Sequence, residues 1–288
     1  MISLRSRLAQ AVILALAVLA LYFPVLKRLA LQWWRDENYS HGFLVPLVSL
    51  FLIWQRREEL KGLNPQPSLW GLPVIFGALF ILLGGQVTAE LFTTRVSLII
   101  LSAGIILYLL GKEFLKNLAF PLSFLILMVP LPAIIFNQIA FPLQLVAANF
   151  ATFNLQAIGV PVFREGNIIN LANATLEVTE ACSGIRSLMS LTALSLIFAY
   201  FSQHSLWKRA VLTISAVPIA IFSNAMRVAG TGALAHFVGA ETAMGFYHTF
   251  SGWLVFVVAF GLLLLEGYII STLFRERRPA MLLSEATE

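Results

Sequence analysis

Long apolar runs separated by short clusters of charged residues dominate the chain. We expect membrane spans over residues 8–26, 43–54, 71–88, 96–110, 118–130 (extending as far as 135), 183–201, 210–228 and 248–273. Most of these runs are shorter than the roughly 20 residues that an untilted helix needs to cross the bilayer core. The pattern predicts an all-α polytopic membrane protein with about eight transmembrane helices.

Composition supports a membrane protein and changes how the basic residues are interpreted. The 288 residues are 59% hydrophobic and 11% charged, with a net charge of +5 and a mean hydropathy of +0.86. A basic chain can indicate nucleic-acid binding, but here the basic residues lie in clusters between apolar spans. They therefore indicate orientation in the bilayer, and we expect no nucleic-acid partner.

The basic clusters also set the predicted topology. Arg5 and Arg7 precede the first span and are expected to be cytoplasmic, as are Lys208, Arg209 and residues 275–278. Residues 137–158 mix apolar with amide side chains and are compatible with a polar-faced span, a re-entrant hairpin or an interfacial helix. The basic clusters all fall inside only if this segment does not cross, so we favour a non-crossing segment with both termini cytoplasmic.

Residues 159–179 form the outer loop in this topology. They contain two short stretches rich in Val, Ile and Thr, VPVFREGNIINL and ATLEV, with Gly166 and Asn173 at the breaks. This composition predicts a small β-hairpin near residues 160–180. We interpret residues 1–288 as one integral-membrane domain, with a catalytic half at about 160–275.

Three chemically distinctive residues fall at one depth near the outer face. Cys182, the only cysteine, opens the span at 183–201; Arg227 closes the next span and His248 opens the last. Each has a structural alternative: cysteine as a small packing residue, arginine as an interfacial side chain, and histidine as an interfacial hydrogen-bonder. Their shared level favours a site, since ionisable residues within membranes usually mark function.

The surrounding residues suit acyl transfer. A helix N-terminus and the nearby Arg186 favour a thiolate at Cys182, whereas Glu177 and Glu180 oppose it. Gly184 would let a substrate backbone approach closely. Asn224 and Arg227, three residues apart, share a helix face and can direct donors at an oxyanion. Cysteine, histidine and arginine together make a candidate acyl-transfer site.

Three segments resemble signature regions of the exosortase family. They are EACSGIRSL at residues 180–188, NAMRV at 224–228 and FYHTFSG at 246–252. DENYSHGFLVPL (36–47), GVPVFREGNII (159–169) and TGALAHFVG (231–239) match further regions. The resemblance spans most of the chain and implies a bacterial inner-membrane cysteine peptidase or transpeptidase, with its active site at the periplasmic face.

The resemblance also implies roles and partners. Cys182 matches the family nucleophile, Arg227 the essential arginine and His248 the histidine. Ser183, Gly184, Arg186 and Asn224 lie inside the matched motifs and are predicted to support the site. Family substrates carry a C-terminal Pro-Glu-Pro (PEP-CTERM) sorting signal with one transmembrane helix and a basic tail. The frequent setting is export beside exopolysaccharide production in Gram-negative bacteria.

Other assignments are more open. Tyr39, His41 and Glu180 are candidate substrate-binding residues, with a structural turn as the alternative for Tyr39 and His41. We expect no cofactor and no metal, since no closely spaced ligand set occurs, and the acceptor is water or an unknown nucleophile. The competing classes are a multi-span transporter and a lipid-linked glycan assembly protein without peptidase activity. A transporter would place charged or broken helices near the midplane, where this chain has few charges.

Overall fold

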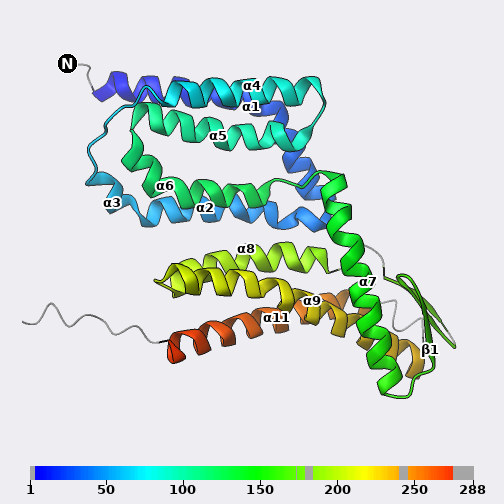
Figure 1. Cartoon of the computed structure of the whole chain (residues 1–288). Helices are drawn as coiled ribbons and strands as arrows, with labels where there is room; N and C mark the ends of the chain where they lie inside the picture. The colour runs from blue at the N-terminus through cyan, green and yellow to red at the C-terminus, as the bar shows by residue number, and fades with distance from the viewer. Residues whose placement is uncertain (1–3, 173, 179–183, 240–245, 275–288) are drawn as a thin grey trace, which may run out of the picture. The chain divides into compact units, whose positions relative to one another are not determined.

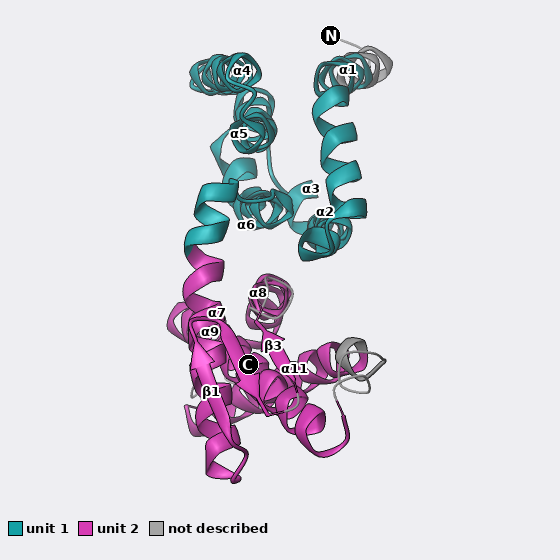
Figure 2. Cartoon of the chain, turned by 90° about the vertical axis from the view of Figure 1, so that its right-hand side faces the viewer, with its two compact units in different colours: residues 1–138 teal, residues 139–288 magenta. Residues whose placement is uncertain are grey.

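The computed structural model (Figure 1) describes residues 4–172, 174–178, 184–239 and 246–274, with the side chains of residues 4–11 and 246–249 outside that description. The chain divides into two compact units, Met1–Gln138 and Ile139–Glu288 (Figure 2). Helices predominate in both units and a small sheet lies in the second, so the predicted all-α membrane fold is confirmed.

Unit 1 is a set of helices. Its elements are α1 (Leu4–Arg35), the 3₁₀ helix η1 (Glu37–Phe43), α2 (Leu44–Gln55), α3 (Arg57–Lys61), α4 (Gly71–Val87), α5 (Leu91–Leu109), α6 (Lys112–Phe124), the 3₁₀ helix η2 (Leu125–Met128) and the start of α7 (Ala133–Ala157). The first helix continues to Arg35, so the predicted end of the first span at residue 26 is wrong. Trp33 and Trp34 belong to its last turns.

Small residues set the helix packing in unit 1. A Cβ at Gly71 would lie 2.5 Å from the Tyr108 backbone, and one at Gly85 would lie 2.5 Å from Thr93 Oγ1, so α4 and α5 approach closely at both ends. Such close approach through small residues is the usual basis of helix association in membranes. The hydroxyls of Tyr22 and Ser97, 2.9 Å apart, join α1 to α5.

Unit 2 combines a helical bundle with a small sheet. It holds the rest of α7, strands β1 (Val162–Glu165), β2 (Ile168–Leu171) and β3 (Thr175–Glu177), and helices α8 (Ile185–Ser202), α9 (Leu206–Phe237) and α11 (Phe246–Leu273). The strands pair antiparallel in the order β1-β2-β3. The predicted β structure at 160–180 is confirmed. The stretch VPVFREGNIINL alone forms a hairpin, β1 and β2, that turns at Gly166, whose φ is +63°. The stretch ATLEV therefore supplies a third strand, β3.

Helix α9 takes part in both hydrophobic cores of unit 2. Its first half, with Leu212, Ala216 and Ala220, packs with α8 and α11. Its second half packs with α7 and the sheet through Val228, Ala229 and Ala235. The helix continues through Thr231–Phe237, beyond the predicted end of the span at residue 228. Arg227 therefore lies inside a continuous helix, ten residues before its end.

Within the described residues, six helices are long and apolar enough to cross a membrane. By length and composition they are α1, α5, α7, α8, α9 and α11; α4 is apolar but shorter. The predicted spans at 43–54 and 118–130 correspond to α2 and to α6 with η2, of 12, 13 and 4 residues. Ser49 Oγ donates to the carbonyl of Pro121 at 2.8 Å and so joins these two short helices.

The segment at residues 137–158 is one continuous helix, so the re-entrant hairpin among the three alternatives is wrong. Helix α7 meets the length and composition of a span. Within unit 2, however, it runs across the direction of α8 in both views (Figures 1 and 2). It also buries Ala147, Ala148 and Ala151 with the sheet and the second half of α9. Both observations favour the interfacial alternative.

We therefore predict that the two ends of α7 are accessible from one side. Asn137 and Gln156 are exposed near those ends and, being 19 residues apart, lie about 28 Å apart along the helix. That length would nearly span the bilayer core if α7 crossed. In a Cys182→Ala background, Asn137→Cys and Gln156→Cys should both react with an impermeant maleimide added outside intact cells. Leu69→Cys, on the predicted inner side, should react only after permeabilisation; protection of Gln156→Cys alone would show that α7 crosses.

Candidate active site

The segment carrying the predicted nucleophile lies outside the described residues, but both of its flanks are described. Glu180, Cys182 and Ser183 fall in the range 179–183. Before it, Val178 is buried, its N–H donates to the Asn167 carbonyl at 2.9 Å, and its carbonyl accepts from Asn167 Nδ2 at 3.2 Å. After it, Gly184 begins α8. The sheet and α8 thus anchor the two ends of this segment.

Gly184 fits closely against Asn224 of α9. Its φ is +84°, which side-chain-bearing residues rarely adopt. A Cβ added there would lie 2.8 Å from both Cβ and Cγ of Asn224, closer than nonbonded carbon atoms pack. Asn224 itself is 1% exposed. Both backbone conformation and space therefore require glycine at this position, and the contact sets the start of α8 against the turn of α9 that carries Arg227.

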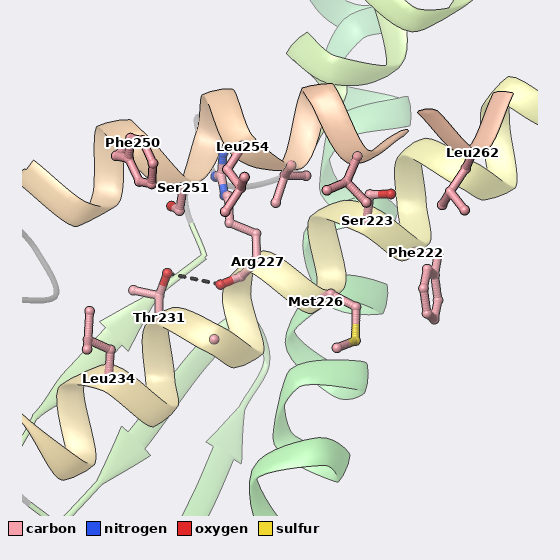
Figure 3. Close-up of a pocket in the computed structure, with 13 residues that line it drawn as sticks. Phe222, Ser223, Met226, Arg227, Thr231, Leu234, Phe250, Ser251, Leu254 and Leu262 are labelled. Atoms are coloured by element: carbon pink, nitrogen blue, oxygen red, sulfur yellow. Dashed lines mark hydrogen bonds between the residues drawn. The ribbon is translucent and has the colours of Figure 1, made fainter. Parts of the chain in front are cut away.

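Arg227 lies against α11. A Cβ added at Gly252 would lie 3.3 Å from Arg227 Nη1, and Figure 3 shows the arginine side chain reaching from α9 toward α11 near Ser251 and Leu254. Gly252 is one helical turn beyond His248, whose backbone belongs to α11 and whose side chain lies outside the description. Asn224 and Arg227 are close on α9 as predicted, but they contact different neighbouring helices.

These two contacts bring together parts of all three matched segments. Gly184 belongs to the first segment, Asn224 and Arg227 to the second, and Gly252 to the third. Arg186 is half-buried in the first turn of α8, where a cation adds to the positive end of the helix dipole. Glu177, which would oppose a thiolate, is exposed on β3, so water screens its charge.

A groove of about 400 Å³ runs between α9 and α11 beside Arg227 (Figure 3). Its lining residues are Phe222, Ser223, Met226, Arg227, Gly230, Thr231, Leu234, Phe250, Ser251, Leu254, Val255, Val258 and Leu262. Large apolar side chains such as Phe222 and Val258 are half-exposed, whereas Ser223, Gly230 and Ser251 are small. Among the described lining residues, Arg227 alone is charged. The groove is therefore apolar along its length, with one cation.

Tyr39 and His41 lie in unit 1, where they hold the connection after α6. The Tyr39 hydroxyl accepts from Leu131 N–H at 3.2 Å, and His41 Nε2 lies 3.3 Å from the Leu127 carbonyl. Trp33 Nε1 donates to the Met128 carbonyl at 2.9 Å. Burial lowers the pKa of His41 despite its hydrogen bonds with backbone groups, so its ring is neutral at pH 7. Substrate binding by either residue stays a prediction.

His204 and His236 take no part in the Gly184–Asn224 and Gly252–Arg227 contacts. His204 lies two residues after the end of α8, and the 18 residues of that helix separate its two ends by about 27 Å along the axis. His236 is in the last turn of α9, with its ring centroid 4.9 Å from that of Phe237. Within the described ranges, no group of three His, Cys, Asp or Glu side chains has the arrangement of a metal site.

The structure adds features that sequence reasoning missed. The groove is one; its only sequence signal is Ser223, Arg227 and Thr231 at four-residue spacing on α9. Gly252 is another, because nothing in the sequence indicates that it lies against Arg227. Glu266 is a third: within α11 its carboxyl group accepts a hydrogen bond from the Ser215 hydroxyl of α9, which joins the two helices.

These features define a polytopic membrane protein with a polar site where helices α8, α9 and α11 meet. The sequence model of the transmembrane exosortases matches residues 33–265. The chain therefore belongs to the transmembrane exosortase family, and the predicted membership is confirmed. The matched region includes every residue named above as catalytic or supporting. Searches of curated proteins and of solved structures find no match.

We predict that alanine at Gly184 disrupts the site far more than alanine at Gly166. Both glycines have a left-handed φ, so each substitution costs about 1–2 kcal/mol in backbone strain. A Cβ at Gly166 meets nothing within 4 Å. At Gly184 the clash with Asn224 should cost about 1–3 kcal/mol more. Denaturant titration in mixed micelles would measure both; equal losses would mean that the packing on Asn224 has no energetic weight.

Proposed function

We propose that this protein is a membrane-embedded cysteine transpeptidase or peptidase that cleaves the C-terminal PEP-CTERM sorting signal of exported proteins. The observation that carries the proposal is the pair of contacts Gly184–Asn224 and Gly252–Arg227, which joins the three matched segments. Covalent connectivity keeps the Cα of Cys182 within about 7.6 Å of that of Gly184. Family membership supports a sorting role for this site.

The proposed chemistry is acyl transfer through a thioester. The Cys182 thiolate attacks the scissile carbonyl carbon, and the oxyanion is stabilised by the Arg227 guanidinium. The C–N bond then breaks, and protonated His248 gives its proton to the leaving amine. Water or an acceptor amine next attacks the thioester and passes a proton back to His248. The carbon–sulfur bond breaks, and the thiolate is restored.

The start of α8 supports activation of the thiol. The helix N-terminus and the Arg186 cation both favour a negative charge at Cys182. Water screens the opposing charge of the exposed Glu177. Arg186, Asn224, Ser183 and Gly184 would then position and activate the nucleophile, while Glu180 would contact substrate. The two positive influences therefore outweigh the screened charge of Glu177 in this proposal, and the thiolate is favoured.

The groove between α9 and α11 suits lateral entry of the substrate's transmembrane helix. From Phe222 to Leu234 it follows 12 residues of α9, or about 18 Å, with small residues that allow close helix approach. Arg227 would face the acidic motif at the end of that helix. The leaving segment would stay in the bilayer, and the processed domain would be freed or transferred on the outer side.

We place the protein in the inner membrane of a Gram-negative bacterium, with both termini cytoplasmic and the site periplasmic. The Arg5, Arg7, Lys208 and Arg209 clusters support this orientation. Exopolysaccharide export is the expected setting. Partners would be PEP-CTERM substrates, the bilayer and an acceptor of unknown chemistry.

The test is processing of a sorting-signal substrate in membranes. Cys182→Ala should abolish cleavage, since no other thiol is present. Arg227→Gln should reduce it about 100-fold or more, as loss of an oxyanion donor does. The matched control is Ser202→Ala, exposed at the far end of α8, which should cleave normally. Normal cleavage by Cys182→Ala would eliminate the nucleophile, and a transporter or glycan assembly protein would give no cleavage with any variant.

A further inference from the structure

A second cavity, in unit 1, lies apart from every residue assigned to the proposed reaction. It has a volume of about 410 Å³ and lies where α1 passes the turn between α4 and α5. Arg28 of α1, Gln86 of α4, and Thr94 and Arg95 of α5 contribute polar side chains to its wall. This volume is within the range of small-molecule sites.

Arg95 is buried in an unusual state. It is 3% exposed, and its Nη2 donates to Gln32 Oε1 at 2.8 Å. Its Nε is also buried but has no hydrogen-bond partner among the described residues. A buried donor without an acceptor is costly, more so on a charged group. Arg95 also lines the cavity, so a ligand held there would lie next to this guanidinium.

The charges at this cavity favour an anion. Burial alone would raise the pKa of Glu90, but hydrogen bonds from Thr93 and Phe92 and the charge of Arg95 lower that pKa on balance. Glu90 is therefore ionised, and its carboxylate caps α5 by accepting from the N–H groups of Phe92 and Thr93. Arg28 and Arg95 both line the cavity, whereas Glu90 is not among its lining residues. The local charge is net positive.

The position favours a lipid headgroup. Helices α1 and α5 are candidate spans, and the cavity lies at the N-terminal end of α5, which carries its one charged residue, Arg95, and the capping Glu90. Basic pockets between transmembrane helices bind phosphorylated headgroups. The planar donor fork of arginine matches the geometry of phosphate oxygens. Gln86 adds an exposed amide at the cavity wall.

We propose that Arg28 and Arg95 form a phosphate-binding site, which takes the headgroup of a membrane phospholipid between α1 and the α4–α5 turn. The phosphate accepts from the guanidiniums of Arg95 and Arg28, while the acyl chains extend along the apolar helices. This site is independent of the acyl-transfer site and would hold whether or not the chain cleaves peptides.

The test uses the purified full chain in a neutral detergent. Native mass spectrometry would follow binding of phosphatidylglycerol, and separate thermal unfolding would follow stabilisation by inorganic phosphate. Diacylglycerol, which lacks phosphate, is the matched ligand control. The variants are Arg28→Gln and Arg95→Gln. Lys27→Gln, an exposed cation next to Arg28 that does not line the cavity, is the matched control variant.

We expect Arg28→Gln to weaken phosphatidylglycerol binding about tenfold, as loss of one charge-assisted contact does, with no effect of Lys27→Gln. Arg95→Gln should weaken it similarly; if that buried substitution prevents folding, Arg28→Gln still decides. Arg28-dependent stabilisation by inorganic phosphate alone would support the same site with a free anion as its ligand. Equal weakening by Lys27→Gln, or no loss in Arg28→Gln with either probe, would overturn the proposal.

Discussion

The site depends on the contact between Gly184 and Asn224. Because Gly184 has a left-handed φ and no room for a Cβ, the start of α8 is held against one turn of α9. Arg227 lies one turn further along the same helix and packs on Gly252 of α11. A side chain at Gly184 would force the start of α8 away from α9, whereas one at Gly252 would displace the end of the Arg227 side chain. These two glycines thus lie where three sequence-distant segments meet.

The rest of unit 2 supports that meeting point from two sides. The first half of α9 packs in the bundle with α8 and α11, and the second half packs beneath α7 and the sheet. Arg227 lies between these two cores. The sheet also anchors residue 178, just before the segment that carries Cys182. The chain is thus held by the sheet just before this segment and packs on α9 at Gly184 just after it.

Much of this could be predicted from sequence, because apolar runs and β-branched stretches are local signals. The helix positions in the bundle and the β structure near 160–180 followed from them. The continuation of α9 past Gly230 could not be predicted, because glycines are common where helices end. The packing explains Gly232: a Cβ added there would lie 2.7 Å from Leu155. The length of α1 was missed because Trp33 appears interfacial, although its indole hydrogen-bonds the chain after α6.

The candidate residues were found from chemistry and from motif resemblance, whereas their mutual placement needed tertiary contacts. Spacing put Asn224 and Arg227 near one another on α9; only packing showed that one contacts α8 and the other α11. Nothing local marks Gly252 or the groove, because both arise from how α11 lies against α9. From the sequence, we could infer only that the three segments lie at a similar depth, not which residues touch.

The central claim is that Cys182 carries the acyl group at this meeting point. Purified protein would be mixed with a synthetic sorting-signal peptide, quenched in acid at early times and digested for mass spectrometry. The account predicts that the peptide containing Cys182 gains the mass of the substrate's N-terminal fragment, that hydroxylamine removes it, and that Arg227→Gln prevents it. Cleavage of the peptide with Cys182 unmodified at all times, and undiminished after alkylation of that thiol, would contradict the account.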